Sequence, residues 1–257
     1  MIQDLLSNHS VHYVGTAPCH TIGIVIANLD PIVRYLLQIP EEISSIGILS
    51  TRIGTGTVVV AIDEAVKRTN TVFLKFELSR DTEGYGGPGT LLVIGSQDVN
   101  DCYEAIHYSL DYVTKYARNI FINEVGHLEI ATTARAGVVL NGIFGIPLNK
   151  AFGFTAVGPA GIGLVTADSI LKESPIKITF IETPATLTYN NQVTVTFTGD
   201  YSAVKKASTL VYDKWSALAA TLGSEPESIY TFGQPDSSCQ CICFNKQTTD
   251  FFWEYVP

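Results

Sequence analysis

The sequence is poor in charge and has no apolar run long enough to cross a membrane. Only 16% of its 257 residues are charged, and 16 Lys and Arg stand against 25 Asp and Glu, for a formal net charge of −9. The cations are scattered, so no basic stripe is present to follow a phosphate backbone. No apolar run approaches the roughly 20 residues of a spanning helix. We therefore expect neither nucleic acid nor membrane partners and, since Met1–Asp4 lacks a basic signal start, a cytosolic protein.

Motifs for metals, disulfides and catalysis are also scarce. The five cysteines are odd in number and do not suggest a disulfide framework in a cytosolic protein. The pairs His9-x-x-His12 and Cys19-His20 do not supply four ligands at zinc spacing. No G-x-S-x-G nucleophile motif occurs. The sequence therefore predicts no metal, no cofactor and no catalytic residue.

What the chain has in abundance is apolar surface. Hydrophobic residues make up 46% of it, and the mean hydropathy is +0.22. A chain of this length buries roughly three quarters of its unfolded surface, so a sizeable core is possible. The remaining apolar surface must be hidden inside the chain or against copies of itself.

The chain contains an internal repeat with a period close to 105 residues. The matching pairs are Gly56 with Gly161, Asp63 with Asp168 and Lys67 with Lys172 at a separation of 105, Gly95 with Gly199 at 104, and His20 with His127 at 107. Such a period is too long for a solenoid and fits one small domain. We therefore expect two copies of one shape, with Asp63 and Asp168 in like surroundings.

Each copy shows the same alternation of strands and helices. The first copy predicts strands at 21–28, 45–51, 71–78 and 90–95, a short helix opened by Asp30-Pro31, and helices at 57–68 and 98–116. The second predicts strands at 127–133, 150–157, 176–183 and 192–199 and helices at 135–144, 161–173 and 202–222. The fold class is α/β, more narrowly an α+β fold of ferredoxin-like layers.

Several stretches resemble bacterial microcompartment shell proteins, in particular the tandem-domain propanediol-utilisation and ethanol-utilisation B-type members. In chain order they are Val14-Gly-Thr-Ala, Ile24-Val-Ile-Ala-Asn, Asp63-Glu-Ala-Val-Lys-Arg-Thr-Asn, Asn123-Glu-Val-Gly-His-Leu-Glu, Thr133-Ala-Arg-Ala and Ala219-Ala-Thr-Leu-Gly-Ser-Glu-Pro. The resemblance implies two circularly permuted shell domains at 14–118 and 119–222, an N-terminal extension at 1–13 and a C-terminal tail at 223–257.

The same resemblance implies a structural, non-enzymatic function. Three chains would close into a pseudohexagonal disc, and such discs would tile edge to edge into the facets of a microcompartment shell. The partners would be copies of this chain and other shell proteins at the tile edges. Small polar metabolites such as diols, alcohols and aldehydes would cross the disc through pores.

A glycine-rich loop in the first copy allows two interpretations. Gly84-Tyr-Gly-Gly-Pro-Gly89 satisfies the dinucleotide pattern G-x-G-x-x-G, but a strand follows it where that pattern needs a helix, so the residues alone favour a hairpin loop. The resemblance places this loop and its counterpart 184–191 around a central pore. The implied pore residues are Ser79, Arg80, Asp81, Thr82, Glu83, Gly84, Tyr85, Gly86, Gly87, Pro184, Thr186, Thr188, Tyr189 and Asn190.

Lys67 and Lys172 end equivalent helices of the two copies. Taken alone, each is a solvated lysine that favours a helix C-terminus. The resemblance implies that both lie at the disc edge and contact neighbouring discs.

A polar cluster lies at the start of the second copy and consists of Asn123, Glu124, His127 and Glu129. A catalytic interpretation would pair Glu124 with His127 as base and orienting group. A structural interpretation has the cluster satisfy backbone groups. The resemblance adds a third, a channel between subunits that hydrogen-bonds a small polyol.

Two alternatives to a shell tile stay open at this point. One is a soluble, trimeric small-molecule sensor of ferredoxin-like type that does not assemble into sheets. The other is an enzyme that uses Glu124 and His127. Loss of sheet formation on replacing Lys67 and Lys172 would separate a tile from a sensor, and saturable turnover would indicate an enzyme.

Overall fold

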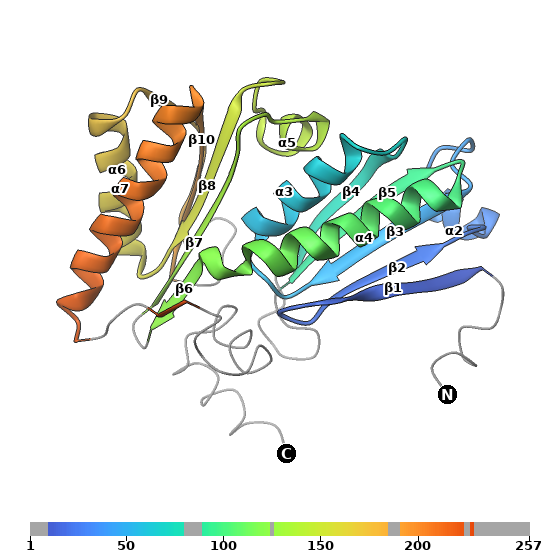
Figure 1. Cartoon of the computed structure of the whole chain (residues 1–257), viewed down its shortest axis with the longest axis horizontal. Coiled ribbons are helices and arrows are strands. Elements are labelled where there is room, and N and C mark those ends of the chain that lie inside the picture. The colour runs from blue at the N-terminus through green and yellow to red at the C-terminus, as the bar shows by residue number, and fades with distance from the viewer. Residues whose placement is uncertain (1–9, 80–88, 124–125, 185–190, 224–226, 229–257) are drawn as a thin grey trace, which may run out of the picture.

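The computed structural model describes residues 10–79, 89–123, 126–184, 191–223 and 227–228, which form two similar units (Figure 1). The first contains β1 (Val11–Ala17), β2 (Thr21–Ile26), α2 (Pro31–Leu36), β3 (Ser45–Thr51), α3 (Thr55–Val66), β4 (Val72–Ser79), β5 (Gly89–Ser96) and α4 (Val99–Tyr116). The second contains β6 (Ile120–Asn123), β7 (Gly126–Thr133), α5 (Val138–Phe144), β8 (Ala151–Val157), α6 (Ala160–Glu173), β9 (Ile176–Glu182), β10 (Val193–Gly199), α7 (Tyr201–Ala220) and β11 (Glu227–Ser228).

The two sheets have the same topology. Their strand orders are β1-β2-β3-β5-β4 and β6-β7-β8-β10-β9, with β11 added beside β6, and neighbouring strands are antiparallel. This confirms the predicted repeat and the layered α/β class. The pairing register also identifies equivalent residues in the two sheets. Ile22, which pairs with Ser50 in the first sheet, is equivalent to Glu129, which pairs with Ala156 in the second.

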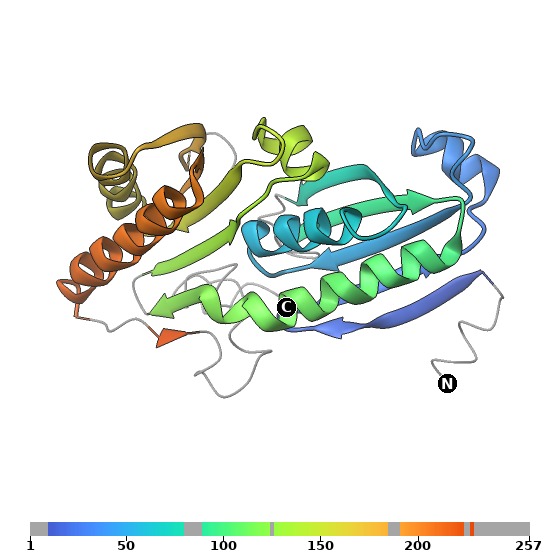
Figure 2. The same ribbon diagram turned by 45° about the horizontal axis from the view of Figure 1, so that its top comes forward.

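Helix α3 lies between the units, beside β7 and α5 of the second unit (Figures 1 and 2). One hydrophobic cluster therefore runs through both units, and it contains Val59 and Ile62 of α3 together with Val139, Phe152 and Phe154 of the second unit. A separate cluster around Trp215 fills the space between the second sheet and its own helices α6 and α7. The second sheet is thus covered on both faces.

Two strands and one helix start differ from the sequence prediction. Strands β1 and β6 were not predicted, and the hairpin that joins β1 to β2 turns at Cys19 and His20, whose φ angles are 65° and 51°. Neither residue is a usual turn former, so the local turn signal is missing. Helix α5 begins at Val138 and not at Arg135, because its first turn is fixed by a side chain from the other unit.

None of the helices in the described ranges is both long enough and apolar enough to cross a membrane.

Candidate assembly interface

Helix α3 is buried on two faces. One face packs on its own sheet and on α4. The other face repeats at the i, i+3, i+4, i+7 spacing of one helix surface and consists of Gly56, Val59, Val60 and Asp63, all of them buried. We call these four residues the joint stripe, and their contact with the second unit the joint.

Gly56 allows α3 to approach the second sheet closely. A Cβ atom added at Gly56 would lie 2.2 Å from Cδ1 of Phe154 on β8. No side chain fits in that gap, so glycine is required by the packing of the two units and not by its backbone angles.

Asp63 caps a helix of the second unit. Its Oδ2 accepts a hydrogen bond from the backbone N–H of Gly137 (2.8 Å), and its Oδ1 accepts from Val139 and Leu140 (both 3.2 Å). These N–H groups start α5 and have no partner within that helix, and the positive end of the helix dipole favours a carboxylate. Asp63 therefore fixes the orientation of α5 on α3.

Lys67 completes this end of the joint. Its ammonium lies 3.1 Å from Asp63 Oδ2, 2.5 Å from Glu64 Oε1 and 2.6 Å from the carbonyl oxygen of Arg135. An ammonium has three donors, and all three are used inside this chain. A groove of about 670 Å³ runs alongside Lys67, Arg135 and Leu148.

Glu129 occupies the opposite end of the joint. It lies on β7, is 2% exposed, and its Oε1 accepts a hydrogen bond from the N–H of Thr57 (2.9 Å) in the first turn of α3. Burial raises the pKa of this carboxyl from 4.5 to about 7, although the hydrogen bonds from Thr57 work in the opposite direction. Each unit thus places one carboxyl group at the start of a helix of the other unit. Asp63 does so at one end of α3, and Glu129 does so at the other.

The raised pKa of Glu129 predicts a loss of stability with rising pH. Folding favours the protonated carboxyl, so this contribution is fully present below about pH 4.5 and is lost as the pH rises to about 7. The expected loss is about 3 kcal/mol in the free energy of unfolding. Urea unfolding of Glu129→Gln should lack this decline. Parallel pH profiles for the variant and the unmodified chain would contradict the assignment.

The equivalent stripe of α6 is uncovered. It consists of Gly161, Leu164, Val165 and Asp168, each 105 positions after its counterpart in the joint stripe, and all four are exposed. Leu164 is 51% and Val165 is 47% exposed, whereas Val59 and Val60 are fully buried. A Cβ added at Gly161 would meet nothing within 4 Å. We call these residues the open stripe.

The expectation of like surroundings for Asp63 and Asp168 is therefore wrong for the single chain. The side chain of Asp63 is fully buried, and that of Asp168 is 61% exposed. The reason is that α3 faces the second unit of its own chain, whereas no element among the described residues covers the same face of α6.

The first unit carries the surface that would complement the open stripe. In the joint, β7 and α5 meet α3, and their equivalents in the first unit are β2 and α2. Their outward side chains are only partly covered or exposed, and three of them on α2 are 42–70% exposed. We call this surface the open face; it comprises Ile22, Ile24, Ile32, Val33, Leu36 and Ile48.

The structure places three of the four residues predicted to line a metabolite channel, all on the paired strands β6 and β7. Glu124 lies outside the described residues, and Asn123 ends β6. Burial lowers the pKa of His127 to about 4, although a hydrogen bond with the Gln192 side chain acts in the opposite direction. The imidazole is therefore neutral at pH 7. Glu129 lies within the joint. The channel itself stays a prediction.

The other predicted site residues are placed only in part. Ser79 ends β4 and Pro184 follows β9, whereas the remaining predicted pore residues lie outside the described ranges. The side chain of Lys172 is 71% exposed and lies 2.7 Å from Asp168. The tile-edge role of the two lysines stays a prediction.

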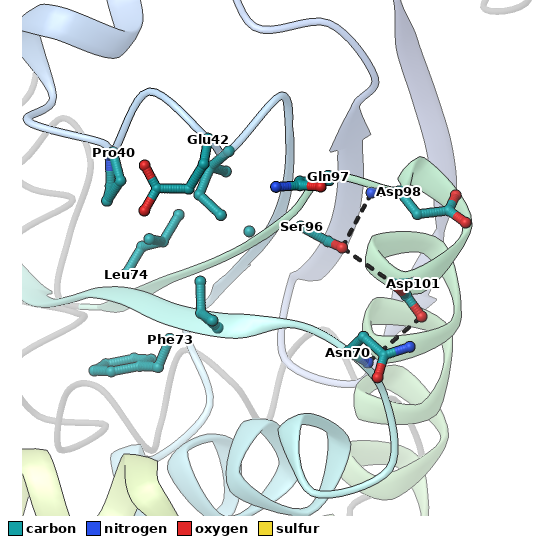
Figure 3. A pocket seen from close by; sticks show the side chains of 12 residues that line it. Pro40, Glu42, Asn70, Phe73, Leu74, Ser96, Gln97, Asp98 and Asp101 are labelled. Carbon is teal, nitrogen blue, oxygen red and sulfur yellow. Dashed lines mark hydrogen bonds between the residues drawn. The ribbon is translucent and has the colours of Figure 1, made fainter.

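A second hollow, of about 700 Å³, lies at the start of β4 (Figure 3). Three acidic residues line it, and two of them, Asp98 and Asp101, have structural partners. Asp98 caps α4 by accepting from the N–H of Asn100 (2.8 Å), and Asp101 accepts from the Ser96 hydroxyl (3.3 Å) and the Asn70 N–H (3.4 Å). We therefore interpret this cluster as a set of local caps.

Metal ligands and thiols of the described residues were the next candidates, and neither forms a site there. Within the described ranges no group of three or more His, Cys, Asp or Glu side chains is placed to hold a metal ion. Cys102 is free and buried, and burial raises the pKa of its thiol to about 12. Cys19 is disulfide-bonded, which the odd cysteine count did not suggest.

Comparison with known proteins identifies the family. The model of the BMC domain matches residues 151–217. The bacterial microcompartment shell protein PduB of Salmonella typhimurium is 38% identical over 217 residues, which cover 84% of this chain and 80% of the relative. The crystal structure of EtuB from Clostridium kluyveri is 37% identical and superposes with a TM-score of 0.79 over 84% of this chain and 95% of that one.

A second solved structure agrees. A crystal structure described as a trimeric bacterial microcompartment shell protein PduB is 34% identical, with a TM-score of 0.77 over 84% of this chain and 96% of that one. The identity and coverage of these relatives confirm the resemblance noted in the sequence. This chain therefore belongs to the bacterial microcompartment shell proteins, a structural and non-enzymatic family, as a tandem-domain member of the PduB and EtuB kind.

Proposed function

We propose that three copies of this chain close into a ring in which the open stripe of each copy packs on the open face of the next. The single observation that carries the proposal is the contrast between Val59 and Val60, which are buried by the second unit, and Leu164 and Val165, which are 51% and 47% exposed. An apolar surface of this kind indicates a protein partner. The trimeric description of the solved PduB relative supports the same number of chains.

The repeat explains how three chains make a hexagonal tile. A ring of three chains contains six units, and each unit would meet its neighbours through the same two surfaces. Three of these contacts are the joints within chains, and three would form between chains. Such a head-to-tail contact closes into a ring when the rotation between units is right. Six similar edges would then fit a hexagonal lattice of a shell facet.

The pore function follows from the position of the two predicted loops in this ring. Residues 80–88 connect β4 to β5, and residues 183–192 connect β9 to β10, so each chain contributes two equivalent loops. Three chains would supply six loops around one axis. Pore diameter and the polar groups of the loops would select small metabolites such as diols, alcohols and aldehydes.

Electron microscopy of the purified protein at high concentration tests the tile. We expect discs that join into extended sheets, with other shell proteins as further neighbours at the edges. Isolated trimers that do not form sheets would favour the small-molecule sensor, and a monomer would contradict both. The double substitution Lys67→Ala and Lys172→Ala is expected to abolish the sheets.

A further inference from the structure

The two units cap their short helices with carboxylates from different places. In the second unit, Asp63 from α3 accepts from the N–H groups of Val139 and Leu140. In the first unit, the equivalent groups of Ile32 and Val33 donate to Oδ1 of Asp30 (2.8 and 3.4 Å), which directly precedes α2. The first unit therefore supplies its own cap.

Because Asp30 already caps α2, Asp168 of a neighbouring chain has no space to cap α2 in the way that Asp63 caps α5. Residue 137, the counterpart of Asp30, is glycine, and a Cβ there would lie 2.8 Å from Oδ1 of Asp63. The joint thus needs an empty side-chain position opposite its carboxylate. In a ring contact, Asp168 would meet the side chain of Asp30 at that position, with a charge of the same sign.

Lys172 is the cation placed to offset this repulsion. In the joint, the ammonium of Lys67 lies 3.1 Å from Asp63, the carboxylate that caps α5. Lys172 stands at the equivalent position of α6 and is bound to Asp168 at 2.7 Å. On α2, Arg34 donates to the carbonyl oxygens of Leu29 and Glu41, and the described part of the chain shows no ion pair to Asp30.

We propose that Lys172 of each chain lies between its own Asp168 and Asp30 of the partner subunit, and that this ion pair holds the ring contact together. The inference rests on the ring proposed above. Contacts within a chain would then depend on a buried helix cap, and contacts between chains on a partly exposed ion pair that salt screens. Ring assembly would be weakened by high salt while the fold of each chain is not.

A double-substitution cycle tests the pair. Sedimentation velocity over a range of concentrations is compared for the unmodified chain, Lys172→Met, Asp30→Ser and the combination of both. Serine at position 30 keeps the helix cap and removes the charge. Lys115→Met, on the exposed last turn of α4, removes the same charge away from both open surfaces.

We expect Lys172→Met to weaken each contact between chains about tenfold, because two carboxylates are left facing each other. In the Asp30→Ser background the same substitution should have little effect, and Lys115→Met should have none. An unchanged trimer in Lys172→Met, even with sheets lost, would overturn the pair and leave the ring intact. An equal loss in both backgrounds would also overturn it. If the unmodified chain is monomeric throughout, the ring itself has failed.

Discussion

Replacing Gly161 by leucine is expected to prevent ring formation while the chain still folds. Within the chain nothing lies within 4 Å of an added Cβ, so the substitution is harmless to the monomer. In the ring, Gly161 would take the position of Gly56, where the same atom would lie 2.2 Å from Phe154. Overpacking of this kind costs about 1–3 kcal/mol per contact. Three contacts in one ring should leave mostly monomer at concentrations where the unmodified chain is trimeric.

Gly142 provides the matched control. It also lies in a helix and would meet nothing within 4 Å as alanine. Gly142 is exposed beside the joint, so its counterpart Tyr35 would lie outside the equivalent contact between chains. Gly142→Leu should therefore remain trimeric. Sedimentation velocity measures the masses, and circular dichroism confirms that both variants are folded. Equal trimer content for the two variants would contradict the assignment of the open stripe.

Replacing Asp63 by alanine is expected to cost about 3 kcal/mol in the free energy of unfolding. The substitution leaves three N–H groups at the start of α5 without their acceptor and removes one partner of Lys67. The measurement is best made in the Gly161→Leu background, where assembly does not contribute. Urea unfolding gives the free energy directly.

Asp168→Ala in the same background is the comparison. Asp168 occupies the equivalent helix position, but its side chain is 61% exposed and pairs with Lys172. An exposed pair of this kind contributes at most about 1 kcal/mol. We therefore expect a large effect at position 63 and a small one at position 168. Equal effects would show that the helix cap does not hold the two units together.

Most of the fold could be predicted from the sequence, because the signals are local and occur twice. The strand 45–51 and the helix that Asp98 caps were predicted to within a residue. Strand β1 was missed because its turn at Cys19 and His20 carries no glycine or asparagine. The sequence predicts a start for α5 that is three residues too early, because the first turn of this helix depends on Asp63, which lies far away in the sequence.

The candidate site could be predicted only as pairs of matching residues. Gly56 with Gly161 and Asp63 with Asp168 were found as repeats, but the sequence does not say which member of a pair is covered within the chain. That depends on the order of the two units, since α3 precedes the unit that covers it and no further unit follows α6 among the described residues. For Glu129 the sequence predicts a channel role, whereas its place in the joint depends on the tertiary contact between β7 and α3.

Cross-linking between the open stripe and the open face tests the ring most directly. In a background in which Cys239, Cys241 and Cys243 are replaced by serine, a chain that carries both Leu164→Cys and Ile32→Cys is treated with a short bismaleimide and separated under denaturing conditions. Their counterparts Val59 and Val139 lie together in one buried cluster of the joint. We predict covalent species of up to three chains that stop at three times the 27.9 kDa chain mass, and neither single variant should form them. Absence of cross-linked trimer, or a ladder that continues beyond three chains, would contradict a closed ring.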